Sequence, residues 1–184
     1  METRPPENSD RPYYLEPKDR SPQQSALIKR VIDGPRGRVP PNLYMWLNNV
    51  EFAEVAEKFG EYTSQKARFQ PLAKEIIILL TASHWRSTFE WYHHAPHAKK
   101  HGATAAQLDA LWNKTDPKFA DPIDQLTYEV AFAVIEKHEV SDDLYKRAIA
   151  KLGHVGVSDI IGLAGLYTMI AQSMAFYKIE APKE

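Results

Sequence analysis

EIIILLTASHWRSTFEWYHHAPHAKKHG, residues 75–102, connects the most apolar helical pattern of the chain to its densest cluster of proton-transferring side chains. Apolar residues point in nearly every direction around a helix over IIILLTA, which predicts an element that is buried on most sides. Glu75 stands at the edge of this run, either as a surface cap or as a buried acid. Five of the seven histidines lie at positions 84–101. We therefore expect any active site to lie within this stretch.

Three polar residues after the apolar run share one helix face. Ser87, Glu90 and His94 are spaced at i, i+3 and i+7, and 3.6 residues per turn place such residues above one another. Glutamate and histidine can hold and transfer protons, so this face is a candidate for general acid–base chemistry. The alternative interpretation is a face whose polar groups only satisfy one another beside the core.

The order Glu75, Ser87, Glu90, His94 resembles the signature of the carboxymuconolactone decarboxylase family, which also contains the alkyl hydroperoxidase D proteins. In the peroxidase branch a Cys-x-x-Cys pair occupies the two middle positions. The string FEWYHHAPHA is similar to the cysteine-less, decarboxylase-like branch, and the resemblance extends roughly over residues 38–182. It implies an all-α fold of the alkyl hydroperoxidase D-like type, no cofactor, and a homo-oligomer such as a dimer, trimer or hexamer.

The resemblance also implies a reaction, the decarboxylation of a small carboxylated lactone or related carboxylic acid. Loss of carbon dioxide beside a double bond needs a group that holds the acid and a general acid that protonates the developing dienolate. We interpret His94 as the proton donor, with Glu75 and Glu90 as its orienting and proton-relaying partners. Ser87 would donate one hydrogen bond to the substrate.

Further substrate-binding candidates flank this cluster or precede it: Arg86, Arg36, Arg38, His93, His97 and Trp91. A guanidinium can hold a carboxylate through two parallel hydrogen bonds, and Arg36 and Arg38 stand in a loop rich in glycine and proline. The alternative for these two arginines is a solvated surface position. For Trp91 the alternative is the core or a subunit interface.

His93, His97 and His101 form a second stripe, at i, i+4 and i+8, and imidazoles at such spacing can share a zinc ion. Pro96 interrupts this stripe, because a proline inside a helix kinks or restarts it. His101 stands before Gly102 at a helix end, where histidine favours the helix dipole. We therefore expect no metal.

Two other functions fit the same residues. A lactone hydrolase or isomerase could use the His/Glu pair, since a histidine between carboxylates can also activate water. A non-catalytic ligand-binding or assembly protein would retain only the pocket. A thiol peroxidase is disfavoured, because the chain contains no cysteine and the thiolate is the reactive group of such enzymes.

Composition narrows the class of protein. The 184 residues are 43% hydrophobic and carry a net charge of −1, so we expect a globular protein that binds neither nucleic acid nor an anionic membrane surface. No apolar run reaches the length of a membrane span. The simplest interpretation is a soluble, cytoplasmic protein. Its aromatic content favours burial of further surface in a homo-oligomer.

Residues 1–21 are polar and rich in proline, which predicts a flexible or draped arm before a single helical domain over residues 22–184. Late in the chain we expect a helix over residues 142–152 and a last helix, capped by Ser158, that ends near Tyr177. No segment shows a strand pattern. The predicted fold class is all-α, a compact bundle of about seven or eight helices.

Overall fold

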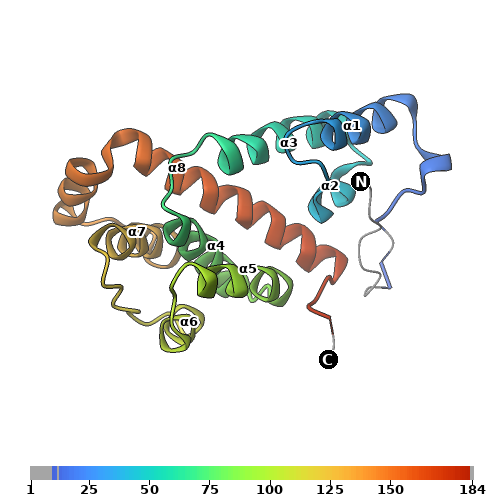
Figure 1. Ribbon diagram of the computed structural model, residues 1–184. Coiled ribbons are helices and arrows are strands. Elements are labelled where there is room, and N and C mark those ends of the chain that lie inside the picture. The colour runs from blue at the N-terminus through green and yellow to red at the C-terminus, as the bar shows by residue number, and fades with distance from the viewer. Residues whose placement is uncertain (1–9, 12, 183–184) are drawn as a thin grey trace. The chain divides into compact units, whose positions relative to one another are not determined.

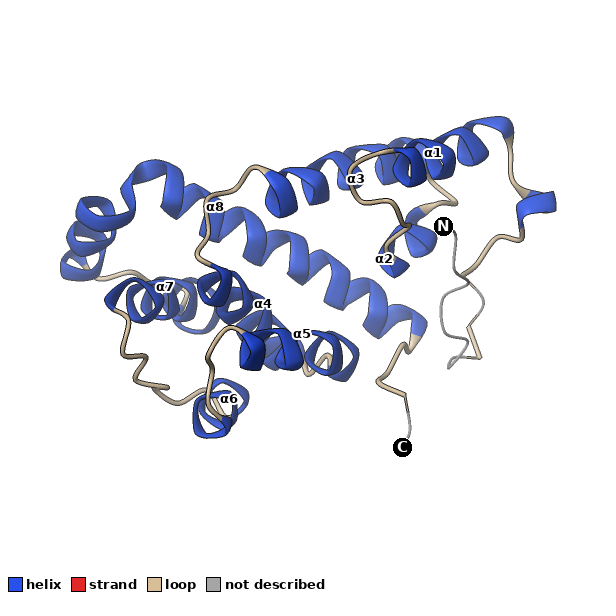
Figure 2. Cartoon of the chain, viewed as in Figure 1, coloured by secondary structure: helices blue, strands red, loops and turns tan. Residues whose placement is uncertain are grey.

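The computed structural model describes residues 10, 11 and 13–182, and this part of the chain is all-α (Figure 1). Its α-helices are α1 (Pro22–Asp33), α2 (Pro41–Trp46), α3 (Val50–Gln65), α4 (Pro71–Trp85), α5 (Thr88–Lys100), α6 (Ala105–Trp112), α7 (Pro122–Phe132) and α8 (Asp142–Tyr177). Two shorter elements are the 3-10 turn η1 (Pro17–Asp19) and the π-helical turn η2 (Ala133–Lys137). Within the described residues only loops join these helices and no strand occurs (Figure 2). The predicted all-α fold is confirmed.

Contacts divide the chain into two compact units. The first contains the described residues up to Lys66 together with Ser173–Glu180, and the second contains Ala67–Gln172 with the described residues from Ala181. The expectation of a single domain over residues 22–184 remains a prediction.

The described part of the N-terminal arm packs within the first unit. The ring of Tyr13 lies 5.4 Å from that of Tyr177, and the ring of Tyr14 lies 5.0 Å from that of Tyr44. Such aromatic pairs stabilise a docked segment beyond the area that they bury. Tyr13 and Tyr14 therefore contact helices of the first unit, the flexible or draped character of the arm remains a prediction, and residues 1–9 and 12 lie outside the described part.

Helix α4 is the centre of the second unit, as its all-round apolar pattern predicts. Every residue from Glu75 to Ser83 is buried, and α5, α6, α7 and η2 pack around the helix. At its end Arg86 adopts a left-handed backbone, with φ 53° and ψ 35°. This tight turn reverses the chain, so that α5 packs against α4.

Helix α5 continues through Pro96, so of the two predicted effects, a kink or a restart, the restart does not occur. It remains helical from Thr88 to Lys100, although the proline nitrogen cannot donate to a preceding carbonyl. Pro96 is exposed, while Ala95 and Ala98 are buried. The apolar contacts on the buried side therefore hold the helix together through the position where one hydrogen bond is missing.

Helix α8 contains the two successive helices that we predicted for the end of the chain, but the last one does not begin at Ser158. Over Asp142–Tyr177 two helical segments are joined across a kink at Gly153, which has φ 68° and ψ 172°. Only glycine adopts this backbone conformation readily. The break therefore lies at Gly153, and Ser158 stands inside the helix.

Among the described residues, α8 is long and apolar enough to cross a membrane by length and composition alone. Its most apolar window has a mean hydropathy of 1.4, and 39% of that window is buried. The core helix of a soluble protein passes the same test. The absence of a membrane partner thus remains a prediction.

Candidate active site

His94 lies between two buried carboxyl groups of the second unit. Its Nδ1 is 2.7 Å from Glu75 Oε2, and its Nε2 is 3.4 Å from Glu90 Oε2. Glu75 and Glu90 are only 8% and 6% exposed, and the side chain of His94 is 19% exposed. The structure thus brings together all three residues that we predicted to be catalytic.

Two helices position this cluster. Glu75 stands in the second turn of α4 and is a buried acid, not a surface cap. Glu90 and His94 are one turn apart on α5, which makes them neighbours on the face that meets α4. Ser87 is the N-cap residue of α5, and its buried side chain does not cap the helix. It therefore lies at the end of α5 nearest to Glu90.

A fourth member of the cluster, from α8, was not predicted. The hydroxyl of Tyr167 lies 3.2 Å from His94 Nε2, and the two rings meet edge-on at 5.3 Å between centroids. Tyr167 is the one side chain with a strong polar tip in the otherwise small and apolar stretch GLAGLY, residues 162–167. Buried tyrosines usually find a hydrogen-bond partner, but helical spacing cannot identify one that is 73 positions away.

The two carboxylates favour a protonated His94. Burial by itself disfavours the charged ring, but hydrogen bonds and charge interactions with Glu75 and Glu90 outweigh it and raise the pKa of His94 to about 9. At neutral pH the imidazolium then has two N–H donors. One faces Glu75, and the other faces Glu90 and Tyr167. The site is therefore suited to donating a proton.

Folding should be linked to this protonation. Because the pKa of His94 is about 9 in the folded chain and 6.5 ordinarily, the folded state binds the proton more tightly between these values. The stabilisation is complete below pH 6.5 and is lost as the pH rises through 9, by about 3 kcal/mol in total. Urea denaturation at a series of pH values measures the free energy of unfolding across this window.

His94→Gln is the matched control for this titration, and we expect its free energy of unfolding to vary much less between pH 6.5 and 9. Asp124 does not interfere, because burial and the nearby Asp121 raise its pKa to about 6, below the window. An equal pH dependence in the wild type and in His94→Gln would contradict the assignment.

The arginines predicted to hold a carboxylate have other contacts or lie in the other unit. The guanidinium of Arg86 lies over the ring of Trp112, 5.3 Å from its centroid, and within the described residues no hydrogen bond or ion pair joins it to the His94 cluster. Arg36 belongs to the first unit and pairs with Glu57 at 3.1 Å. Arg38 is an exposed residue of the same unit. Their substrate-binding role remains a prediction.

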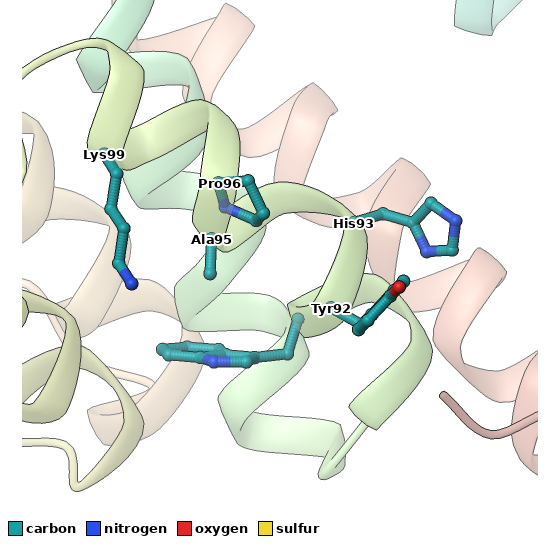
Figure 3. A pocket seen from close by; sticks show the side chains of 6 residues that line it. Tyr92, His93, Ala95, Pro96 and Lys99 are labelled. Atoms are coloured by element: carbon teal, nitrogen blue, oxygen red, sulfur yellow. The ribbon is translucent and has the colours of Figure 1, made fainter. Parts of the chain in front are cut away.

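The remaining candidates are also residues of α5, and Trp91 and His93 point away from the face of Glu90 because adjacent helical residues point about 100° apart. Trp91 and His93 contribute to an open surface pocket of about 490 Å³, together with Tyr92, Ala95, Pro96 and Lys99 (Figure 3). The ring of His93 also contacts the carbonyl of Phe89 at 2.9 Å. His97 is exposed, and its ring lies 6.1 Å from that of His94. Within the described part of the chain, His97 is thus the one of these three whose ring contacts the ring of His94.

The second histidine stripe does not converge on a common point. His101 is the C-cap residue of α5, at the far end of the helix from Glu90. In the described part of the chain, no three histidine, aspartate or glutamate side chains are grouped so that they could hold a metal ion. The polar contacts of His94 that the structure shows are therefore those with Glu75, Glu90 and Tyr167.

Comparison with known proteins defines the fold. No family model and no curated protein matches the chain. An uncharacterized peroxidase-related protein from Silicibacter sp. TM1040 superimposes with a TM-score of 0.69 and 15% identity, covering 96% of this chain and 93% of that chain. An alkylhydroperoxidase AhpD core protein from Ralstonia eutropha JMP134 has a TM-score of 0.69 and 14% identity, with coverage of 96% and 93%. The debrominase Bmp8, solved with 2,3,4-tribromopyrrole, has a TM-score of 0.69 and 13% identity, covering 95% of both chains.

These likenesses place the chain in one structural class, the all-α proteins with an AhpD-like fold. At 13–15% identity they show the fold alone. The chemistry must therefore be argued from the residues around His94.

Proposed function

We propose that this chain is a cofactor-independent enzyme that decarboxylates a small carboxylated lactone or related acid. The observation that carries the proposal is the position of His94, held by Glu75 on one ring nitrogen and by Glu90 and Tyr167 on the other. A buried imidazolium with two carboxylate partners is a proton donor that needs no cofactor. The resemblance to the decarboxylase-like branch supplies the substrate class.

In the proposed reaction the carbon–carbon bond to the carboxylate breaks, and its electron pair passes into the conjugated system as carbon dioxide leaves. His94 then delivers the proton on Nε2 to the far end of that system. Glu75 keeps Nδ1 oriented, and the carboxylate of Glu90 lies close enough to relay a proton from water back to Nε2. Tyr167 lies beside the donated proton, where its hydroxyl can stabilise the developing enolate.

The charge on His94 favours this chemistry over hydrolysis, in which the ring would have to act as a base toward water. With its pKa raised to about 9 by the glutamates against the effect of burial, the ring holds a proton at neutral pH and must lose it before it can act as a base. A thiol peroxidase reaction requires a reactive cysteine, and this chain contains none.

Mass spectrometry of a carboxymuconolactone-type acid incubated with the protein tests the proposal. We expect loss of the mass of carbon dioxide. Gain of the mass of water would indicate a lactone hydrolase, and an isomer of unchanged mass would indicate an isomerase. Binding of the acid without any conversion would favour a non-catalytic protein.

Tyr167→Phe should lower kcat for this acid by about tenfold, since it removes one hydrogen bond at the proton-donating side of His94. KM should change less, because the stabilisation is expected mainly in the transition state. Tyr145→Phe is the matched control, as Tyr145 is an exposed residue of the same helix. An unchanged kcat in Tyr167→Phe would show that this side chain only packs on His94.

A further inference from the structure

A separate cavity of the second unit lies between α7 and the first part of α8. It has a volume of about 420 Å³, and its apolar wall consists of Pro122, Ile123, Leu126 and Ala150. This volume lies within the range of small-molecule sites. None of its lining residues belongs to the cluster around His94, so the cavity is distinct from the candidate active site.

The hydrogen-bond acceptors that line this cavity already have donors. Glu129 accepts from Arg147 Nη1 at 2.7 Å and from Gln125 Nε2 at 3.3 Å. The side-chain oxygen of Gln125 accepts from the backbone N–H of Phe119 at 2.9 Å. A ligand that brought further donors, such as an amine, would therefore compete with bonds inside the protein.

Some hydrogen-bond donors that line the cavity have no acceptor in the described part of the chain. Arg147 donates from Nη1 to Glu129 and from Nε to Asp143, which leaves its Nη2 group for a ligand. Lys151 lines the same cavity one turn further along α8, and it has no hydrogen bond or ion pair with any residue in the described part of the chain. Both residues are exposed and also line the cavity, so a ligand held there can pair with their charged groups.

We propose that this cavity binds a small amphipathic monocarboxylate. The apolar body of the ligand would lie against Ile123, Leu126 and Ala150, where it leaves water. Its carboxylate would accept hydrogen bonds from Arg147 and Lys151, the donors that the fold leaves unused. This proposal does not depend on the proposed decarboxylase activity, because the two sites share no residue.

Octanoate is a suitable probe, and octylammonium is the matched probe of opposite charge. Each is titrated into the full-length protein while backbone amide signals are followed by NMR. We expect octanoate to bind with a Kd of about 1 mM or lower, with shifts concentrated in α7 and in residues 147–152. Octylammonium should bind at least about tenfold more weakly, because it offers donors where the cavity needs an acceptor.

Three variants test the assignment to this cavity. Lys151→Gln should raise the Kd for octanoate about threefold to tenfold, as it removes one exposed charged donor. Ala150→Trp places an indole in the cavity from an exposed position and should raise the Kd by more than about tenfold. Lys146→Gln is the control, since Lys146 is exposed on the same helix and does not line the cavity; it should bind as the wild type does.

Any one of three results would overturn the proposal. The first is octanoate binding that Ala150→Trp leaves unchanged while circular dichroism shows a folded protein. The second is an absence of octanoate binding, and the third is an affinity for octylammonium equal to that for octanoate.

Discussion

Replacing His94 by glutamine should lower kcat for decarboxylation by at least about 100-fold, the usual contribution of a general acid. Glutamine keeps a donor near Glu75 but cannot transfer a proton, so it separates the chemical role of the ring from its structural one. Release of carbon dioxide, quantified by mass spectrometry at saturating substrate, measures the effect. The substitution also removes the ring nitrogen Nε2, so Glu90 and Tyr167 lose their contact with it.

The control for this experiment is His154→Gln, because His154 is exposed in the same unit and should leave kcat unchanged. The free energy of unfolding must be measured beside kcat, since the variant leaves two buried carboxylates without their shared cation. A loss of less than about tenfold in a folded His94→Gln would rule out the acid role. Equal binding of the acid by both variants without turnover would favour a binding protein.

Leu79→Ala should lower the free energy of unfolding by about 3 kcal/mol, within the 2–5 kcal/mol usual for such a change. Leu79 is fully buried at the middle of α4, and the helices packed around it cannot close the cavity without moving one another. Urea denaturation at pH 6 measures the loss, because His94 stays protonated there and adds no pH effect.

Val155→Ala provides the comparison, because Val155 is 66% exposed on α8 and its truncation should cost no more than about 0.5 kcal/mol. Similar losses in the two variants would contradict the central position of α4. Leu79→Ala tests the fold independently of any substrate, so its outcome stands whatever reaction the protein catalyses.

The α4–α5 pair could be predicted from sequence because its signals are local. IIILLTA is apolar in every direction, which indicates a fully buried helix before any partner is known. Glu90 and His94 are close in space because they are one helical turn apart. Glu75 joins them from another helix, and here the resemblance to a family signature supplied what spacing alone could not.

The other parts of the site depend on long-range packing. Tyr167 reaches His94 only because α8 lies against α5, a contact between residues 73 positions apart. Ser158 has the chemistry of an N-cap, but the left-handed backbone of Gly153 places the break five residues earlier. Arg86 is adjacent to the cluster in sequence and has a left-handed backbone conformation. Its guanidinium nevertheless lies over the ring of Trp112 and not beside His94. Local patterns identify side chains of the right type, and the packing of helices decides which of them meet.

The burial of Glu75 within α4 has a consequence for how such proteins can diverge. A substitution that loosens α4 also displaces the carboxyl group of Glu75 beside His94, so the proposed proton transfer and the stability of the fold would change together. The exposed side of α5 is under no such restriction, because Tyr92, His93 and Lys99 can change without altering the core. New substrate preferences would therefore be expected to arise on this outer surface, while the proposed proton donor, His94, stays unchanged.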